Sequence, residues 1–141
     1  MEAAARAGLF PFVRPMLREM EQEGIGAAVI TRNCARAVAT VFPDAMTFCQ
    51  CLLTRDHVER VKPDPEHLLC ALEVLDCPPE HCLMVGDHPL DIETGRRAGA
   101  WTAGVAGGRV GEEELRRHGA DITAPDCRVL VDRLKARGWQ I

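Results

Sequence analysis

The sequence predicts an α/β fold in which a mostly parallel sheet is flanked by helices. Short apolar segments alternate with longer ones whose apolar residues repeat at helical spacing. Residues 25–30 form a continuous apolar run, which is typical of a strand covered on both faces. Strands that alternate with helices in this way indicate βαβ units, and therefore parallel strand pairing.

The expected helices begin and end at recognisable residues. Met16, Leu17 and Met20 share one face of a first helix, which Gly24 ends. Asp64 and Pro65 open another, with the aspartate as cap and the proline at the first helical position. Further helices are expected from about residue 33 and at 90–98, 112–118 and about 130–137.

The expected strands lie at 25–30, 46–53, 82–85, 101–105 and 120–123. In open parallel sheets, ligands bind at the carboxyl ends of the strands. Functional residues are therefore expected in the turns that follow these strands.

The composition is that of one globular domain, which we expect to span residues 1–141. Of the 141 residues, 47% are apolar and 27% charged, which suits a soluble protein with a hydrophobic core. The formal net charge of −4 gives no basic footprint for nucleic acid. The apolar runs are too short to span a membrane, and the N-terminus is not a signal peptide. We therefore expect a cytoplasmic protein without a nucleic-acid or membrane partner.

The chain holds seven cysteines, a high and odd number. They form no Cys-x-x-Cys pair and no zinc-like spacing with the histidines. We interpret them as free thiols that act as small core residues in a reducing cytosol, with a redox or metal role as the alternative. They are Cys34, Cys49, Cys51, Cys70, Cys77, Cys82 and Cys127.

Thr31 directly follows the first expected strand and precedes a helix. A hydroxyl at a strand exit, beside the free N–H groups of a helix N-terminus, can bind a phosphate group. The simpler alternative is that Thr31 only caps the next helix.

Lys62 lies in the sequence Val-Lys-Pro-Asp-Pro at residues 61–65, just before a helix. Pro63 restricts the backbone on either side and prevents a helix from passing through it. A lysine held there can present a point charge to a phosphate or a carboxylate. The alternative is a solvated surface lysine.

Asp87 and Asp91 follow the apolar strand at 82–85, separated from it by Gly86. Gly86 permits a sharp turn, and two carboxylates at a strand exit suit a hard cation such as Mg²⁺. Ordinary helix capping is the alternative here.

The three segments together resemble the haloacid dehalogenase (HAD) superfamily of phosphohydrolases, most of all its phosphoglycolate phosphatase-like branch. Thr31 matches the threonine of the family's second motif and Lys62 the lysine of its third. Residues 86–92 (Gly-Asp-His-Pro-Leu-Asp-Ile) match the acidic fourth motif, and residues 98–100 its following Ala-Gly-Ala. The resemblance covers about residues 10–137 and implies a HAD-like Rossmannoid parallel sheet.

The resemblance implies a phosphatase for a small phosphate monoester, acting through Mg²⁺ and an aspartyl-phosphate. Thr31 would bind the phosphate group, and Arg32 and Asn33 would add contacts to it. Lys62 would stabilise negative charge on the nucleophile and the phosphate.

By the same resemblance Asp87 would ligate Mg²⁺, with Asp91 assisting. His88 stands where the family often has a small hydroxyl residue. We expect it to be tolerated there, or to line the pocket.

The family's first motif, a strand that ends in Asp-x-Asp, has no counterpart in this sequence. No aspartate precedes Asp44, and Asp-x-Asp occurs nowhere in the chain. We therefore expect an incomplete sheet that lacks its first, central strand, no cap domain, and a polypeptide that begins upstream of Met1. An unpaired strand edge could also let such chains self-associate.

Two other functions stay open. A protein that binds a phosphorylated ligand or a partner without catalysis would also keep Thr31, Lys62 and Asp87. An unrelated doubly wound domain, such as a receiver-like signalling module, would need a phospho-accepting aspartate near its start, which is absent too. Phosphoglycolate, sugar phosphates and nucleotides are all candidate ligands.

Overall fold

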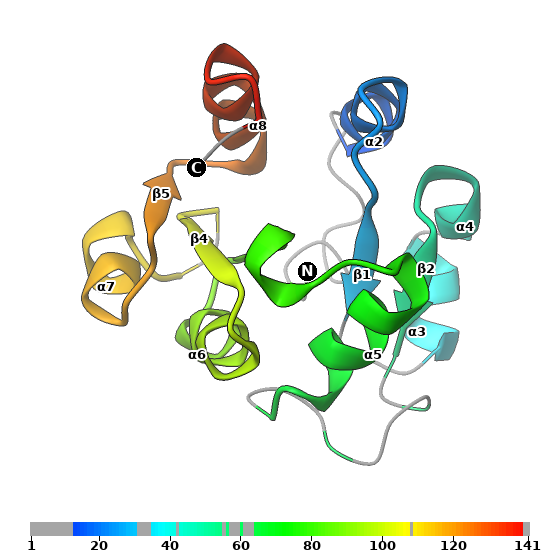
Figure 1. Cartoon of the computed structure of the whole chain (residues 1–141), viewed down its shortest axis with the longest axis horizontal. Coiled ribbons are helices and arrows are strands. Elements are labelled where there is room, and N and C mark those ends of the chain that lie inside the picture. Colours follow the sequence, from blue (N-terminus) through cyan, green and yellow to red (C-terminus); the bar gives the residue numbers. More distant parts are fainter. Residues whose placement is uncertain are drawn as a thin grey trace. The chain divides into compact units, whose positions relative to one another are not determined.

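The computed structural model describes residues 13–30, 35–41, 43–54, 56, 60, 64–107 and 109–139. The chain divides into two compact units, Met1–Pro78 and Pro79–Ile141, and the described strands form one parallel sheet in each (Figure 1). Helices pack against the strands in both units, which confirms the α/β class. The single-domain organisation stays a prediction.

The first unit has a two-stranded parallel sheet. β1 (Ala28–Ile30) pairs with β2 (Cys51–Leu53), with Ala28 opposite Cys51 and Ile30 opposite Leu53. The helices are α2 (Val13–Gln22), α3 (Ala35–Val41), α4 (Ala45–Phe48) and α5 (Glu66–Leu75). α5 packs against both strands through its buried apolar face, which includes Leu68, Ala71 and Leu72.

Gln50 extends this pairing beyond the strands. Its backbone N–H donates to the carbonyl of Ala27 at 2.9 Å, and its side-chain Oε1 accepts from the N–H of Ala27 at 2.6 Å. Residues 25–27, which were expected to belong to the first strand, lie before β1.

The expected strand at 46–53 is wrong in its first half. Ala45–Phe48 is a helix, α4, and only Cys51–Leu53 is a strand. Ala45 and Phe48 lie three residues apart and are both buried, whereas Met46 is exposed. Helical spacing brings Ala45 and Phe48 to one side, where α4 packs against α2 and β2, and this contact outweighs the local strand pattern.

Two arginines of α2 hold α4 in place. Arg14 donates to both carboxylate oxygens of Asp44, the residue before α4, with its Nη2 at 2.7 Å from Oδ1. The guanidinium carbon of Arg18 lies 5.1 Å from the centroid of the Phe48 ring, which is cation–π distance.

The second unit is a three-stranded parallel sheet in the order β3-β4-β5. The strands are β3 (Leu83–Gly86), β4 (Trp101–Val105) and β5 (Ile122–Ala124). The helices are the short 3₁₀ helix η2 (Pro79–His81), α6 (Pro89–Ala98), α7 (Glu112–Arg117) and α8 (Cys127–Ala136). α6 packs on β3 and β4, α7 on β4 and β5, and α8 on β5.

The two faces of this sheet carry separate hydrophobic clusters, because successive strand residues point to opposite sides. Ala103 and Val105 of β4 pack with Leu130 and Leu134 of α8. The other cluster consists of Ile92, Leu115 and Ala120. Helices therefore pack on both faces of this sheet.

Two arginines bond to Thr123 of β5, one of them at the outer edge of the strand. The Ala124 carbonyl faces β4, where it accepts from the N–H of Ala106 at 3.0 Å. The Thr123 carbonyl therefore points away from β4 and accepts from Arg133 at 3.0 Å, while Arg116 donates to the Thr123 hydroxyl at 2.7 Å. Charged groups at a strand edge oppose pairing with another chain.

The six described cysteines are free thiols. Burial raises the pKa of Cys49, Cys51 and Cys127, which favours the protonated and unreactive form. Within the described ranges, no helix has both the length and the apolar character that a membrane crossing requires.

Replacing Gly104 with alanine should destabilise the second unit. The new Cβ would lie 2.7 Å from Cβ and 3.0 Å from Cδ1 of Leu115, which is fully buried. We expect Gly104→Ala to lower the free energy of unfolding by about 1–3 kcal/mol, as overpacking does. The control is Gly107→Ala, where nothing lies within 4 Å, and urea denaturation measures both. Equal stability of the two variants would contradict this packing.

Acid should weaken the contact between α2 and α4. The hydrogen bonds from Arg14 hold the pKa of Asp44 below its ordinary value, so the pair stabilises the fold at neutral pH. This contribution declines once the pH falls below about 4, because Asp44 of the unfolded chain takes up its proton first, and it is gone when the pH is also below the lowered pKa of the folded state. Wild type should therefore exceed Asp44→Asn in stability at about pH 7, and urea denaturation should show the difference shrink toward about pH 3. A difference that stays constant with pH would exclude the ion pair as its source.

Candidate metal and phosphate site

The predicted site residues fall on both units. Asp87 and Asp91 belong to the second unit and are described, as is His88 between them. The other four predicted residues lie outside the described residues: Thr31, Arg32, Asn33 and Lys62.

The acidic turn begins where β3 ends, at Gly86. Gly86 is buried, and a Cβ placed on it would overlap Cβ, Cγ and Oδ2 of Asp91. The side chain of Asp91 is thus packed directly against the backbone of the strand end. Glycine is needed here for this close approach, since its φ is not in the left-handed region.

A capping box closes the turn onto α6. His88 is the N-cap, and its Nδ1 accepts from the N–H of Leu90 at 3.1 Å. In return, Oδ2 of Asp91 accepts from the backbone N–H of His88 at 3.3 Å. Pro89 occupies the first turn, where its missing N–H costs nothing. His88 therefore has a structural role that its position in the sequence did not indicate.

The two aspartates differ in their surroundings. Asp91 is only 4% exposed and its carboxylate braces the turn, whereas Asp87 is partly exposed. Asp87 is thus the one of the pair whose carboxylate has more access to a cation in solution. The capping interaction of Asp91 is the alternative that the sequence left open for this turn, and the role of Asp87 as a metal ligand stays a prediction.

The carboxylates of the acidic turn fit Mg²⁺ as one part of its coordination shell, which further ligands would complete. No group of three or more His, Cys, Asp or Glu side chains in the described ranges could hold a metal ion by itself. Mg²⁺ commonly binds through one or two carboxylates, with waters and substrate phosphate oxygens completing its octahedron. Asp87, with Asp91 behind it, can supply the carboxylate part of such a shell.

At the entrance to α5, the structure places Pro65 at the N-cap instead of the expected Asp64, and Asp64 bonds to the first residue of the helix from one position earlier. The Oδ1 of Asp64 accepts from the N–H of Glu66 at 2.9 Å. α5 begins at Glu66, so Pro65 precedes the helix instead of occupying its first position. The Asp64 bond fixes the helix start four residues after Lys62.

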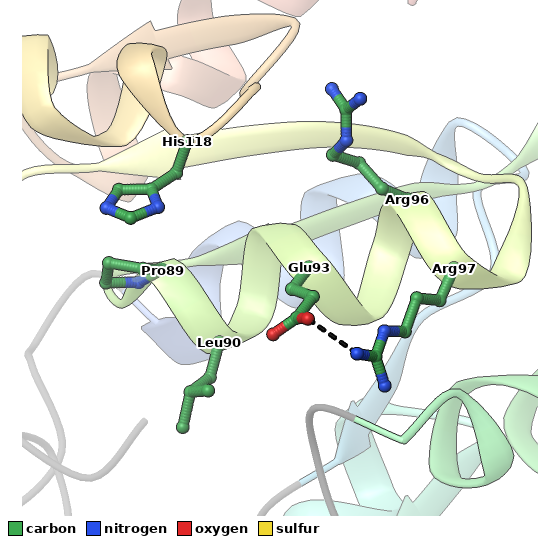
Figure 2. Close-up of a pocket in the computed structure, with 6 residues that line it drawn as sticks. All are labelled: Pro89, Leu90, Glu93, Arg96, Arg97 and His118. Atoms are coloured by element: carbon green, nitrogen blue, oxygen red, sulfur yellow. Dashed lines mark ion pairs between the residues drawn. The ribbon is translucent and has the colours of Figure 1, made fainter.

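A pocket of about 630 Å³ runs along α6. Figure 2 shows the residues that line it: Pro89, Leu90, Glu93, Arg96 and Arg97 of α6, and His118 after α7. Arg97 pairs with Glu93 at 2.7 Å, and Arg96 donates to the carbonyl of Gly119 at 3.3 Å. Both arginines are thus bonded within the protein. Asp87 and Asp91 do not line this pocket, and we assign it no ligand.

Curated relatives of the chain are phosphatases. It is 36% identical over 123 residues to the N-acetylmuramic acid 6-phosphate phosphatase of Pseudomonas aeruginosa, covering 84% of this chain and 54% of that protein. It is also 36% identical over 108 residues to pyrophosphatase PpaX of Bacillus cereus, covering 75% and 50%. The chain thus spans about half the length of these relatives.

Solved structures share the fold. A hydrolase from Pseudomonas syringae matches with a TM-score of 0.84 and 25% identity, over 96% of this chain and 63% of that one. A predicted phosphoglycolate phosphatase from Haemophilus somnus matches with a TM-score of 0.74 and 21% identity, over 92% and 57%. The second likeness concerns the fold alone.

The profile of the haloacid dehalogenase-like hydrolases matches residues 2–105, which is well over half of the chain. The match includes the acidic turn and the segments that carry Thr31 and Lys62. The chain belongs to the haloacid dehalogenase-like hydrolase family.

Proposed function

We propose that this chain carries the phosphate-binding and Mg²⁺-binding part of a phosphatase site for a small phosphate monoester. The observation that supports this most is the acidic turn. Asp87 follows a parallel strand with its carboxylate partly exposed, on a turn that Gly86, His88 and Asp91 fix. A phosphatase that is 36% identical to this chain, over 84% of the chain's length, supports the same chemistry.

Each predicted residue has a distinct task in this proposal. The Thr31 hydroxyl, with Arg32 and Asn33, binds the phosphate oxygens, and Lys62 neutralises their charge as a point cation. Asp87 holds the metal ion, and Asp91 keeps Asp87 in place through the capping box. Mg²⁺, when bound, neutralises phosphate charge and orients the phosphate group.

The nucleophile is the missing part. Turnover through an aspartyl-phosphate requires a carboxylate to attack phosphorus, and none of these 141 residues forms the Asp-x-Asp of the family's first motif. Loss of a covalent nucleophile costs on the order of 10⁶ in turnover in a well-studied hydrolase. We therefore propose that the 141-residue chain binds phosphate with Mg²⁺ but does not hydrolyse esters by itself.

The absence of Asp-x-Asp also favours a second candidate, a protein that binds a phosphorylated ligand or a partner without catalysis. The two candidates differ in how they respond to an Asp-x-Asp strand supplied from outside. A synthetic peptide with a strand ending in Asp-x-Asp-Gly-Thr, added with Mg²⁺ and p-nitrophenyl phosphate, should give turnover only for the phosphatase. N-acetylmuramic acid 6-phosphate, pyrophosphate and phosphoglycolate form the first set of substrates to test.

Inorganic phosphate should raise the melting temperature of the chain only when Mg²⁺ is present. Asp87→Asn should abolish this Mg²⁺-dependent increase, because an amide is a poor ligand for the cation, and Lys62→Ala should reduce it by weakening phosphate binding. Asp132→Asn is the matched control, because Asp132 lies on α8 in an exposed pair with Arg128. Fluorescence-monitored melting measures all four proteins. Hydrolysis of p-nitrophenyl phosphate by the unmodified chain would contradict the proposed lack of a nucleophile.

Gly86→Ala should weaken Mg²⁺-dependent phosphate binding by about tenfold, the lower end of what outer partners of a metal site contribute. The added Cβ displaces Asp91, and the turn that carries Asp87 moves with it. Calorimetric titration with phosphate and Mg²⁺ measures the effect, and Gly107→Ala again serves as the control. Wild-type affinity in a folded Gly86→Ala variant would show that Asp91 does not brace the site.

A further inference from the structure

His67 makes an unusual contact in the first turn of α5. Its ring is completely buried, and its Nε2 lies 2.9 Å from the carbonyl oxygen of Thr54. A carbonyl can only accept, so Nε2 carries the proton and donates. The other ring nitrogen, Nδ1, is buried and has no hydrogen-bond partner in the described part of the chain.

This contact ties α5 to the end of β2. Thr54 directly follows the last residue of β2 and is only 1% exposed. Its hydroxyl oxygen accepts from the backbone N–H of Asp56 at 3.3 Å. Thr54 is thus bonded to both ends of the segment between β2 and α5, through Asp56 on one side and His67 on the other.

Asp56 continues the connection to a third element. Its Oδ2 accepts from the N–H of Ala35 at 2.9 Å, and Ala35 is the first residue of α3. The two residues are 21 positions apart. An aspartate from a distant segment therefore caps the helix that comes after Thr31, Arg32 and Asn33.

The bonded residues flank both predicted phosphate-binding segments. Ala35 follows the Thr31 segment directly, and Lys62 lies between Asp56 and His67 in the sequence. We propose that Asp56 and His67 are positioning residues for the proposed phosphate site, because they join the start of α3, the end of β2 and the first turn of α5, the elements next to the Thr31 and Lys62 segments in the sequence. This inference rests on the proposed function, because it concerns the same site.

Packing alone does not require a histidine at position 67. Leu68, Ala71 and Leu72 already anchor α5 in the core. A buried imidazole with one unpaired nitrogen costs free energy that a leucine would not. What the histidine adds is the bond to the Thr54 carbonyl, which a leucine cannot make.

Four variants test the proposal through the affinity for inorganic phosphate in the presence of Mg²⁺, measured by ³¹P NMR titration. Asp56→Ala removes the cap on α3, and His67→Leu removes the bond to Thr54; each should weaken binding about tenfold. Asp56→Asn retains an acceptor oxygen, and His67→Gln retains a donor that reaches the same carbonyl. Both conservative variants should restore affinity close to that of wild type.

Asp44→Ala is the matched control for a general loss of stability. It removes an aspartate in the same unit that also accepts a hydrogen bond from a distant residue, Arg14. Urea denaturation should show that it destabilises the chain at least as much as Asp56→Ala, whose bond is exposed. Its phosphate affinity should nevertheless equal that of wild type.

The outcomes separate the two proposals. Unchanged affinity in both Asp56→Ala and His67→Leu would overturn the positioning role and leave the phosphate site standing. Should His67→Leu fail to fold, Asp56→Ala decides, because it removes an exposed hydrogen bond, which costs less stability than the loss of a fully buried side chain. Absence of phosphate binding by the wild-type chain would overturn both proposals. If Asp44→Ala lost as much phosphate affinity as Asp56→Ala, lower stability would explain both losses and the positioning role would be overturned.

Discussion

The packing of the Asp91 side chain against the backbone of Gly86 is the contact on which the acidic turn depends. One carboxylate joins the end of β3 to the start of α6, because it touches the strand backbone and accepts a hydrogen bond from His88. The direction in which Asp87 leaves the strand is set by this contact. The strand end and the start of the helix are thus joined by protein groups alone, which is the preorganisation that the proposed Mg²⁺ site would use.

In the first unit, the connection between β2 and α5 is held by hydrogen bonds and not by one packed side chain. Between β2 and α5 the chain is long, and no single residue can brace it as Asp91 braces the short turn after β3. Hydrogen bonds that Thr54 accepts from Asp56 and His67 instead join the two ends of the connection. Short turns can be fixed by one side chain packed on the backbone, whereas longer connections need several bonds distributed along them.

The sequence predicted the second unit more accurately than the first. The strand at 101–105 and the helix ending before Gly99 lie where their patterns indicated, since Gly99 adopts a left-handed φ of 82° that favours glycine. Residues 46–50 were misassigned because the burial of Ala45 and Phe48 depends on α2, which is distant in sequence. The motifs predicted Asp87 and Asp91 as metal ligands, which stays a prediction, and His88 as a cap was missed because histidine is not a common N-cap residue. His67 and Asp56 gave no sequence signal, since each acts through a partner far along the chain.

An arginine at β5 also limits how this sheet can grow. Arg133 donates to the Thr123 carbonyl that points away from β4, while Arg116 bonds the hydroxyl of the same residue. A strand added on that side would have to displace Arg133 from this carbonyl. The contact that satisfies one backbone group therefore also keeps this side of the sheet from serving as a template for another strand.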